Sequence, residues 1–233
     1  MVIFPVAILA IDHLYTVPQG WVSPRYAPWV DARPESFSIL AVCDGNVCRS
    51  PSAQFAIAVR LPGVRVESAG LYARPGAPLC EVVAGAIALE GAEAGDFTST
   101  FRSRRLDDVD LGSFDVALTA TTGIRGELAR AHPELRDRFF TFREAADVLS
   151  AIRDAGIPSE PFDPSSLIAT MNRHRGARAT IADLPSRLRM NVLDPLDIPD
   201  AHGERAKRHR AVVDLALRSA TSIGDSLARL PLT

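Results

Sequence analysis

The residues best suited to chemistry lie together in one stretch, Cys43-Asp44-Gly45-Asn46-Val47-Cys48-Arg49-Ser50-Pro51. An apolar run precedes the stretch and a helical pattern follows it, which is typical of a loop between a strand and a helix. Such a loop directs backbone N–H groups inward and adds the positive end of the helix dipole. The sequence therefore predicts a site for phosphate or a similar oxyanion. It is not an ATP-type loop, because no Gly-Lys-Ser/Thr follows.

The same field acts on Cys43 and favours its thiolate, which makes this cysteine a candidate nucleophile. Arg49 can reach back across the loop, where its planar fork can hold two phosphoryl oxygens as a lysine could not. Ser50 can donate its hydroxyl to the Cys43 sulfur. Gly45 permits a positive φ, and the Asn46 side chain can tie the loop to its neighbours.

The three cysteines, Cys43, Cys48 and Cys80, are too few and odd in number for a disulfide framework, which favours a cytoplasmic protein. Cys43 could instead be a buried, unreactive cysteine, but the complete stretch argues against this.

The spacing of the three cysteines fits no common zinc pattern and no histidine pair accompanies it, so no metal site is expected. His209 is interpreted as structural or solvated. Cys43 and Cys48 lie within one tight loop, which predicts a reversible disulfide between them.

The amino-acid composition limits the classes of partner that this chain is expected to bind. The 233 residues carry a net charge of −2, without the basic excess that a nucleic-acid-binding protein usually shows. No apolar stretch is long enough for a transmembrane helix, so no membrane partner is expected. The apolar start at 1–11 lacks a basic region and a clear cleavage site, which argues against a secretory signal.

Along the rest of the sequence, the spacing of apolar residues indicates strands and helices in alternation. This predicts an α/β fold with a parallel sheet covered on both faces. The strands are expected at 38–43, 64–68, 114–119 and 138–142, and the helices at 50–60, 78–90, 126–132, 143–152 and 204–230, with a loop at 98–105. Residues 1–36 are interpreted as an irregular N-terminal arm. Residues 37–233 are interpreted as one domain with a partly helical insertion at about 153–193.

The stretch from Cys43 to Pro51 resembles the signature of the low-molecular-weight protein tyrosine phosphatases, a superfamily that includes arsenate reductases. Further segments resemble that family at 67–70, 76–78, 103–106, 114–118 and 198–203. The resemblance implies a three-layer α/β/α fold with a four-stranded parallel sheet and the phosphate-binding loop after the first strand. It implies no metal or organic cofactor.

The resemblance also implies the roles of the site residues. Cys43 would be the nucleophile, Arg49 the phosphate clamp and an aspartate the general acid. The substrate would be bound by the remaining loop residues, Asp44, Gly45, Asn46, Val47, Cys48 and Ser50. Ala201 and His202 stand where the family tends to have proline and tyrosine.

Two aspartates compete for the role of general acid. Asp194 precedes Pro195 and so copies the Asp-Pro of the family. Asp200 lacks the proline but lies at the expected spacing from the last helix. The spacing favours Asp200, although both aspartates could simply occupy turns.

The function expected is hydrolysis of phosphotyrosine in proteins through a phosphocysteine. Two alternatives stay open: an arsenate reductase using the same loop, and a non-catalytic phosphate-binding regulatory protein. The expected partners are a phosphotyrosine protein and phosphate or other oxyanions, and the expected assembly is a monomer or a weak dimer. Tyr72 and Arg74, on a loop beside the site, are candidates for setting substrate preference.

Overall fold

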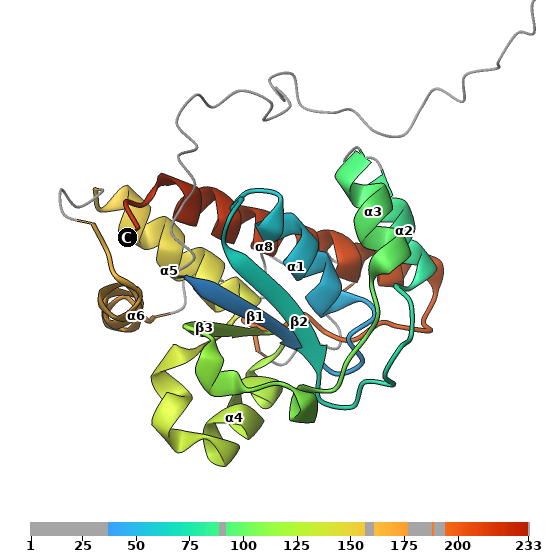
Figure 1. Cartoon of the computed structure of the whole chain (residues 1–233), viewed down its shortest axis with the longest axis horizontal. Coiled ribbons are helices and arrows are strands. Elements are labelled where there is room, and N and C mark those ends of the chain that lie inside the picture. Colours follow the sequence, from blue (N-terminus) through green and yellow to red (C-terminus); the bar gives the residue numbers. More distant parts are fainter. Residues whose placement is uncertain (1–36, 89–91, 157–160, 177–187, 189–193, 233) are drawn as a thin grey trace, which may run out of the picture. The chain divides into compact units, whose positions relative to one another are not determined.

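The computed structural model describes residues 37–88, 92–156, 161–176, 188 and 194–232 (Figure 1). The chain divides into two units, Met1–Asp31 and Ala32–Thr233, and every described residue belongs to the second. The interpreted arm at 1–36 therefore lies outside the described residues. The interpreted insertion is described only in part.

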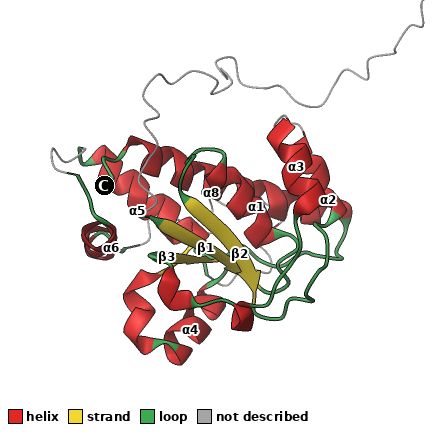
Figure 2. Ribbon diagram, viewed as in Figure 1, coloured by secondary structure: helices red, strands yellow, loops and turns green. Residues whose placement is uncertain are grey.

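Four parallel strands form the sheet, as predicted (Figure 2). They are β1 (Ser38–Cys43), β2 (Arg65–Gly70), β3 (Val116–Thr119) and β4 (Phe139–Thr141), in the order β2-β1-β3-β4. Every residue of β1 is buried, because this strand is central and is covered on both faces. The register pairs Cys43 with Gly70 and Val42 with Thr119, so three strands end beside the loop that follows β1.

Helices cover the sheet on both faces. The helices of the described residues are α1 (Arg49–Ala58), α2 (Glu81–Ile87), α3 (Ala92–Thr100), α4 (Thr122–Ala131), α5 (Phe142–Asp154), α6 (Pro164–Arg173) and α8 (Ala206–Arg229). Three 3₁₀ turns lie at Leu106–Asp108, Leu111–Ser113 and Pro133–Arg138. In Figure 1, α1, α5 and α8 lie on one face of the sheet and α4 on the other, which confirms the three-layer fold.

The last helix, α8, packs against both α1 and α5. Its inner face buries the apolar residues that the sequence pattern assigned to it, Val212, Val213, Leu215, Ala216, Ile223 and Leu227. Helix α5 begins with a complete capping box, in which Thr141 and Glu144 satisfy each other's backbone N–H groups. None of the helices among the described residues is both long and apolar enough to cross a membrane.

Several predicted boundaries were wrong, among them the start of the helix expected at 78–90, which begins at Glu81 as α2. Part of the segment 98–105, predicted as a loop, belongs to α3, where Phe97 stacks at 5.4–5.5 Å on Phe55 and Phe101. Strand β2 continues through Gly70, since pairing with β1 outweighs the tendency of Ala-Gly to end a strand. Helix α4 begins one turn earlier than predicted, because the Thr121 hydroxyl accepts a hydrogen bond from the backbone of Ile124.

Candidate active site

The predicted oxyanion loop lies between the end of β1 and the start of α1. The last residue of β1 is Cys43, and α1 begins at Arg49. The backbone N–H groups in the first turn of any helix lack partners within the helix, and no side chain caps this one. The positive end of α1 therefore faces the loop with donors available for an anion.

The Cys43 sulfur is buried and held by two polar groups. It shares a 3.0 Å hydrogen bond with the Ser50 hydroxyl, and it accepts a 3.3 Å bond from the backbone N–H of Asn46. The Asn46 N–H is a donor to the sulfur, and the Ser50 hydroxyl can be a second one. The geometry suits a thiolate that attacks and later departs.

Asn46 fixes the shape of the loop. Its fully buried side chain donates to the hydroxyls of Ser50 at 3.0 Å and Ser68 at 2.8 Å. Its carbonyl oxygen accepts from the backbone N–H of Arg104 at 2.9 Å. Asn46 also takes the left-handed backbone conformation, with φ of 49°. Gly45, which also permits a positive φ, does not take one; asparagine tolerates this conformation too and here gains three side-chain hydrogen bonds from it.

Sequence reasoning missed Ser68 and Arg104 as parts of the site. Ser68 also donates to the side chain of Gln54 at 2.7 Å, and so links β2 to α1 as well as to the loop. Both residues lie inside segments that resemble the family, at 67–70 and 103–106. That resemblance was the available signal, but neither residue type indicates by itself a contact with Asn46.

Gly70 allows the end of β2 to approach the loop. A Cβ at this position would lie 2.5 Å from the backbone oxygen of Asp44 and 2.8 Å from the backbone nitrogen of Asn46. Side chains do not tolerate such distances to backbone atoms. The absence of a side chain at Gly70 therefore lets the strand support the loop directly.

The Arg49 side chain is only 2% exposed and ends between two carboxylates. Its Nη2 lies 2.7 Å from Asp44 and 2.7 Å from Asp200, while Nη1 donates to the Ile198 carbonyl at 3.2 Å. Burial alone would lower the pKa of this guanidinium. The negative side chains of Cys43, Asp200 and Asp44 outweigh burial and raise the pKa above its usual value. A charged fork is thereby fixed over the loop.

Asp200 lies in the segment that precedes α8. This segment docks at the carboxyl end of β3, where the backbone N–H of Ile198 donates to the Ala120 carbonyl at 2.8 Å. While one carboxylate oxygen of Asp200 contacts Arg49, the other accepts from the backbone N–H of His202 at 2.9 Å. Half of the Asp200 side chain is exposed, so its carboxyl group can exchange protons with solvent.

Asp194, the other candidate for the general acid, stabilises a local turn. The Asp194 carboxylate accepts from the backbone N–H of Leu196 at 2.8 Å, which closes a turn around Pro195. The neighbouring Asp197 binds the first residue of α4 through the Thr122 backbone and hydroxyl. The structure thus brings Asp200, rather than Asp194, to the arginine of the loop.

An aromatic side chain lies at the rim of the loop. The backbone N–H of Tyr72 donates to the Asp44 carbonyl at 2.8 Å, which places Tyr72 beside the loop, and its side chain is 70% exposed. The Tyr72 hydroxyl donates to Glu127 at 3.3 Å, and that carboxylate raises the pKa of the phenol. Tyr72 thus adjoins the site without closing it.

Cys48 belongs to the loop, but its thiol has other partners. It lies 3.2 Å from Nε2 of His209, and Cys80 lies 3.5 Å from the same nitrogen. The hydrogen bond between the two thiols lowers the pKa of Cys80 to about 5 and, together with burial, raises the pKa of Cys48. His209 is only 6% exposed, so of the two interpretations given for it, structural or solvated, the structural one holds.

Comparisons with known proteins agree with the fold and the loop. The model of the family "Low molecular weight phosphotyrosine protein phosphatase" matches residues 38–183. A protein-arginine-phosphatase of Geobacillus stearothermophilus is 31% identical over 109 residues, which cover 46% of this chain and 70% of the relative. The low molecular weight protein-tyrosine-phosphatase Etp of Escherichia coli K12 is 30% identical over 105 residues, covering 45% and 68%.

The fold is also that of solved phosphatases. The tyrosine phosphatase Wzb of Escherichia coli K30, solved in complex with sulphate, superposes with a TM-score of 0.54 at 18% identity, covering 82% of this chain and 97% of Wzb. The family match spans the loop, the whole sheet and the supporting residues around Asn46. The chain therefore belongs to the low molecular weight phosphotyrosine protein phosphatases, a family of hydrolases.

Proposed function

We propose that this enzyme removes phosphate from phosphotyrosine in proteins through a phosphocysteine on Cys43. One observation supports this most strongly: the Cys43 thiol, the uncapped start of α1 and the Arg49 guanidinium converge on one loop, with Asp200 bound to that guanidinium. These are the nucleophile, the oxyanion donors and the acid that a two-step phosphoryl transfer requires.

In the first step the Cys43 sulfur attacks phosphorus, and the bond from phosphorus to the phenolic oxygen breaks. Asp200 gives its proton to that oxygen, so that tyrosine leaves as the neutral phenol. The loop N–H groups and Arg49 hold the equatorial oxygens. A phosphoryl group in the loop competes with Asp44 and Asp200 for Arg49, and this competition frees Asp200 to act as an acid.

In the second step water attacks the phosphocysteine while the Asp200 carboxylate takes its proton. The Cys43 thiolate departs and inorganic phosphate forms. The Ser50 hydroxyl and the Asn46 backbone N–H, at 3.0 and 3.3 Å from the sulfur, stabilise the departing thiolate. The remaining loop residues, Gly45, Val47 and Cys48, contribute backbone to the substrate-binding loop.

Tyr72 supplies an aromatic surface for the substrate ring. Its exposed side chain adjoins Asp44 at the rim, where the phenyl ring of a bound phosphotyrosine would emerge. Stacking of two aromatic rings contributes roughly 0.5–1.5 kcal/mol. We therefore assign Tyr72 to substrate recognition.

We place the enzyme in the cytoplasm, since its three cysteines are free. Residues 37–233 would act as one catalytic domain, in which the segment at about 153–193 is an insertion. Its described helix, α6, packs on α5.

The test uses an aryl phosphate and vanadate. Cys43→Ser should abolish turnover but keep vanadate binding, because the cradle is mostly backbone. Turnover by Cys43→Ser at the native rate would refute the mechanism. Loss of both turnover and binding, in a folded variant, would refute the backbone cradle.

Phosphoarginine is a second candidate substrate. One relative is a protein-arginine-phosphatase, and the partly exposed Asp44 carboxylate at the rim could pair with a guanidinium. The comparison is kcat/KM for a phosphotyrosine peptide against the same peptide with phosphoarginine. We expect the phosphotyrosine peptide to be preferred. A preference for phosphoarginine would change the substrate and leave the role of Cys43 intact.

A further inference from the structure

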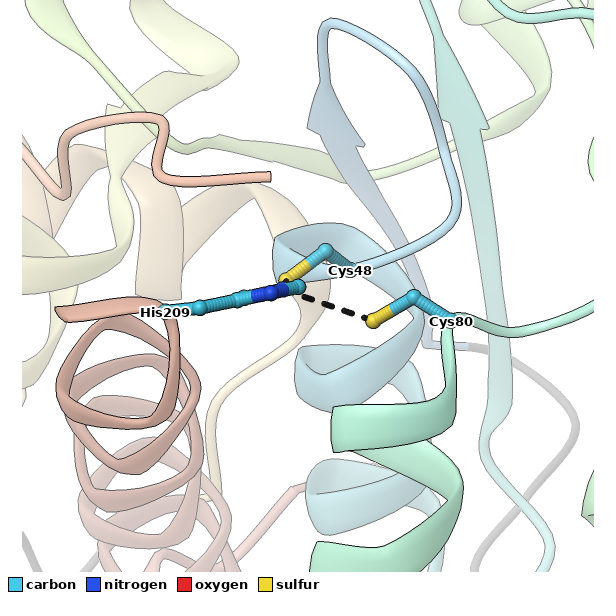
Figure 3. A group of neighbouring side chains, drawn as sticks. All are labelled: Cys48, Cys80 and His209. Atoms are coloured by element: carbon cyan, nitrogen blue, oxygen red, sulfur yellow. Dashed lines mark hydrogen bonds between the residues drawn. The ribbon is translucent and has the colours of Figure 1, made fainter. Parts of the chain in front are cut away.

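Three side chains capable of binding a metal converge behind the phosphate loop (Figure 3). They are Cys48, Cys80 and His209, and their ligand atoms all lie within 4.8 Å of one another. Cys48 and His209 are buried, while Cys80 is partly exposed and gives access from solvent. The proposed phosphatase chemistry uses neither Cys80 nor His209.

The three residues come from three different segments. Cys48 ends the phosphate loop, Cys80 precedes α2, and His209 lies in the first turn of α8. The backbone also joins the first two, because the N–H of Cys80 donates to the Val47 carbonyl at 3.0 Å. The ring of His202 stacks edge-on against the ring of His209, with centroids 5.4 Å apart, and so orients it. The cluster is therefore built on fixed elements.

A single proton or lone pair on His209 cannot serve both sulfurs equally. Nε2 of His209 faces both sulfurs, at 3.2 and 3.5 Å, yet an imidazole nitrogen carries only one proton or one lone pair. A cation among the three atoms would bind all of them at once. With Zn–S of about 2.3 Å and Zn–N of about 2.0–2.1 Å, a tetrahedral site separates sulfur from nitrogen by roughly 3.5 Å. The distances found are close to this value.

We propose that Cys48, Cys80 and His209 bind one Zn²⁺ ion through their two sulfurs and Nε2. Two thiolates and a neutral imidazole are the ligands that zinc prefers, and any thiol protons are released to solvent on binding. Among the described residues no fourth side chain joins the group, so water completes the tetrahedron. This site lies outside the proposed reaction.

The metal would join the phosphate loop to the start of α8. Cys48 directly precedes Arg49, and His209 follows the segment that carries Asp200, so both ends of the Arg49–Asp200 ion pair lie close in sequence to a ligand. Zinc would thus hold the loop and the acid segment together. The expected effect is a higher melting temperature of the zinc-loaded protein.

The test is a zinc titration of the full chain carrying Cys43→Ser, so that the active-site thiol cannot bind the metal. Competition with a chromophoric chelator should give one equivalent. Cobalt in place of zinc should show intense sulfur-to-metal charge-transfer bands and tetrahedral d–d bands. Each of Cys80→Ser and His209→Gln should weaken zinc binding by more than the ~10–100-fold that loss of an outer-shell partner costs. The matched control, His132→Gln, removes an exposed histidine and should leave the affinity unchanged.

Three results would overturn the proposal. One is the absence of a zinc equivalent in the folded Cys43→Ser protein. Another is an affinity that Cys80→Ser, nearly isosteric and checked for folding by circular dichroism, does not change. The third is a Cys48–Cys80 disulfide formed in air that zinc does not prevent, which would make the cluster a dithiol. None of them depends on turnover, so the proposed phosphatase activity can stand or fall separately.

Discussion

The Arg49 guanidinium is buried and shared by two carboxylates, so its shape matters as much as its charge. A lysine would place a point charge where the loop needs a planar fork. Arg49→Lys should lower kcat for an aryl phosphate on the order of 10²–10³-fold, the cost of removing one oxyanion donor. Steady-state kinetics measure this. A kcat close to that of the native enzyme would mean that Arg49 serves the structure and not the transition state.

Asp200 and Asp194 can be separated by the leaving group. A general acid contributes about 10²–10⁴-fold, and it matters most when the leaving group is a poor one. Asp200→Ala should therefore slow hydrolysis of phenyl phosphate or phosphotyrosine far more than that of an activated nitrophenyl ester. Asp194→Ala should change neither rate much, because Asp194 closes a turn at Leu196. The reverse pattern would make Asp194 the acid.

Strand β2 supports the phosphate loop because their backbones lie close together at Gly70. Gly70→Ala would place a Cβ 2.5 Å from the Asp44 backbone oxygen. Strand and loop must then separate, at a cost of roughly 1–3 kcal/mol in the free energy of unfolding. Activity should fall as well, because the same loop holds the Cys43 sulfur. Urea unfolding and turnover measure the two effects.

A glycine without close neighbours is the matched control. Gly126 lies within α4, and a Cβ there would meet no atom within 4 Å. Gly126→Ala should stabilise the fold by roughly 0.5–1 kcal/mol through helix propensity, with activity unchanged. Equal effects of the two substitutions would show that the Gly70 contact is unimportant.

At the scale of strands and helices, the sequence predicted most of the fold. Strand β1, the loop and α1 follow local patterns, and so do β4 and α8. Helix α3 was missed because its Phe97 packs on Phe55 of α1, a contact between segments distant in the chain.

Contacts between distant residues limited the prediction of the site as well. The loop was predictable from Cys43 to Ser50, because the motif is contiguous. The Cys48–His209 contact joins residues 161 positions apart, and no local pattern indicates it. The left-handed conformation at Asn46 depends on partners supplied by β2 and by Arg104.

For the whole molecule, the family match ends at residue 183, whereas the segment that carries Asp200 and α8 follow it. Arg49 is thus paired with a carboxylate, Asp200, that lies outside the matched region. This segment reaches the loop because it docks at the end of β3 through Ile198.

The placement of the cysteines also predicts that this enzyme has no arsenate reductase activity. That reaction needs further cysteines to resolve the adduct on Cys43, and Cys80 is the only cysteine outside the loop. It is paired with His209 and Cys48. Arsenate should therefore inhibit competitively as an oxyanion. Assays of arsenite formation with thiol donors test this, and sustained turnover would show that Cys80 can reach the adduct.

The most direct measurement traps the phosphoenzyme. The native enzyme is mixed with a ³²P-labelled phosphotyrosine peptide, quenched within one turnover and digested, and the labelled fragment is identified by mass spectrometry. The phosphate should be on Cys43, in a peptide that is absent from Cys43→Ser. Turnover with label on another residue, or turnover by Cys43→Ser, would contradict the phosphocysteine mechanism.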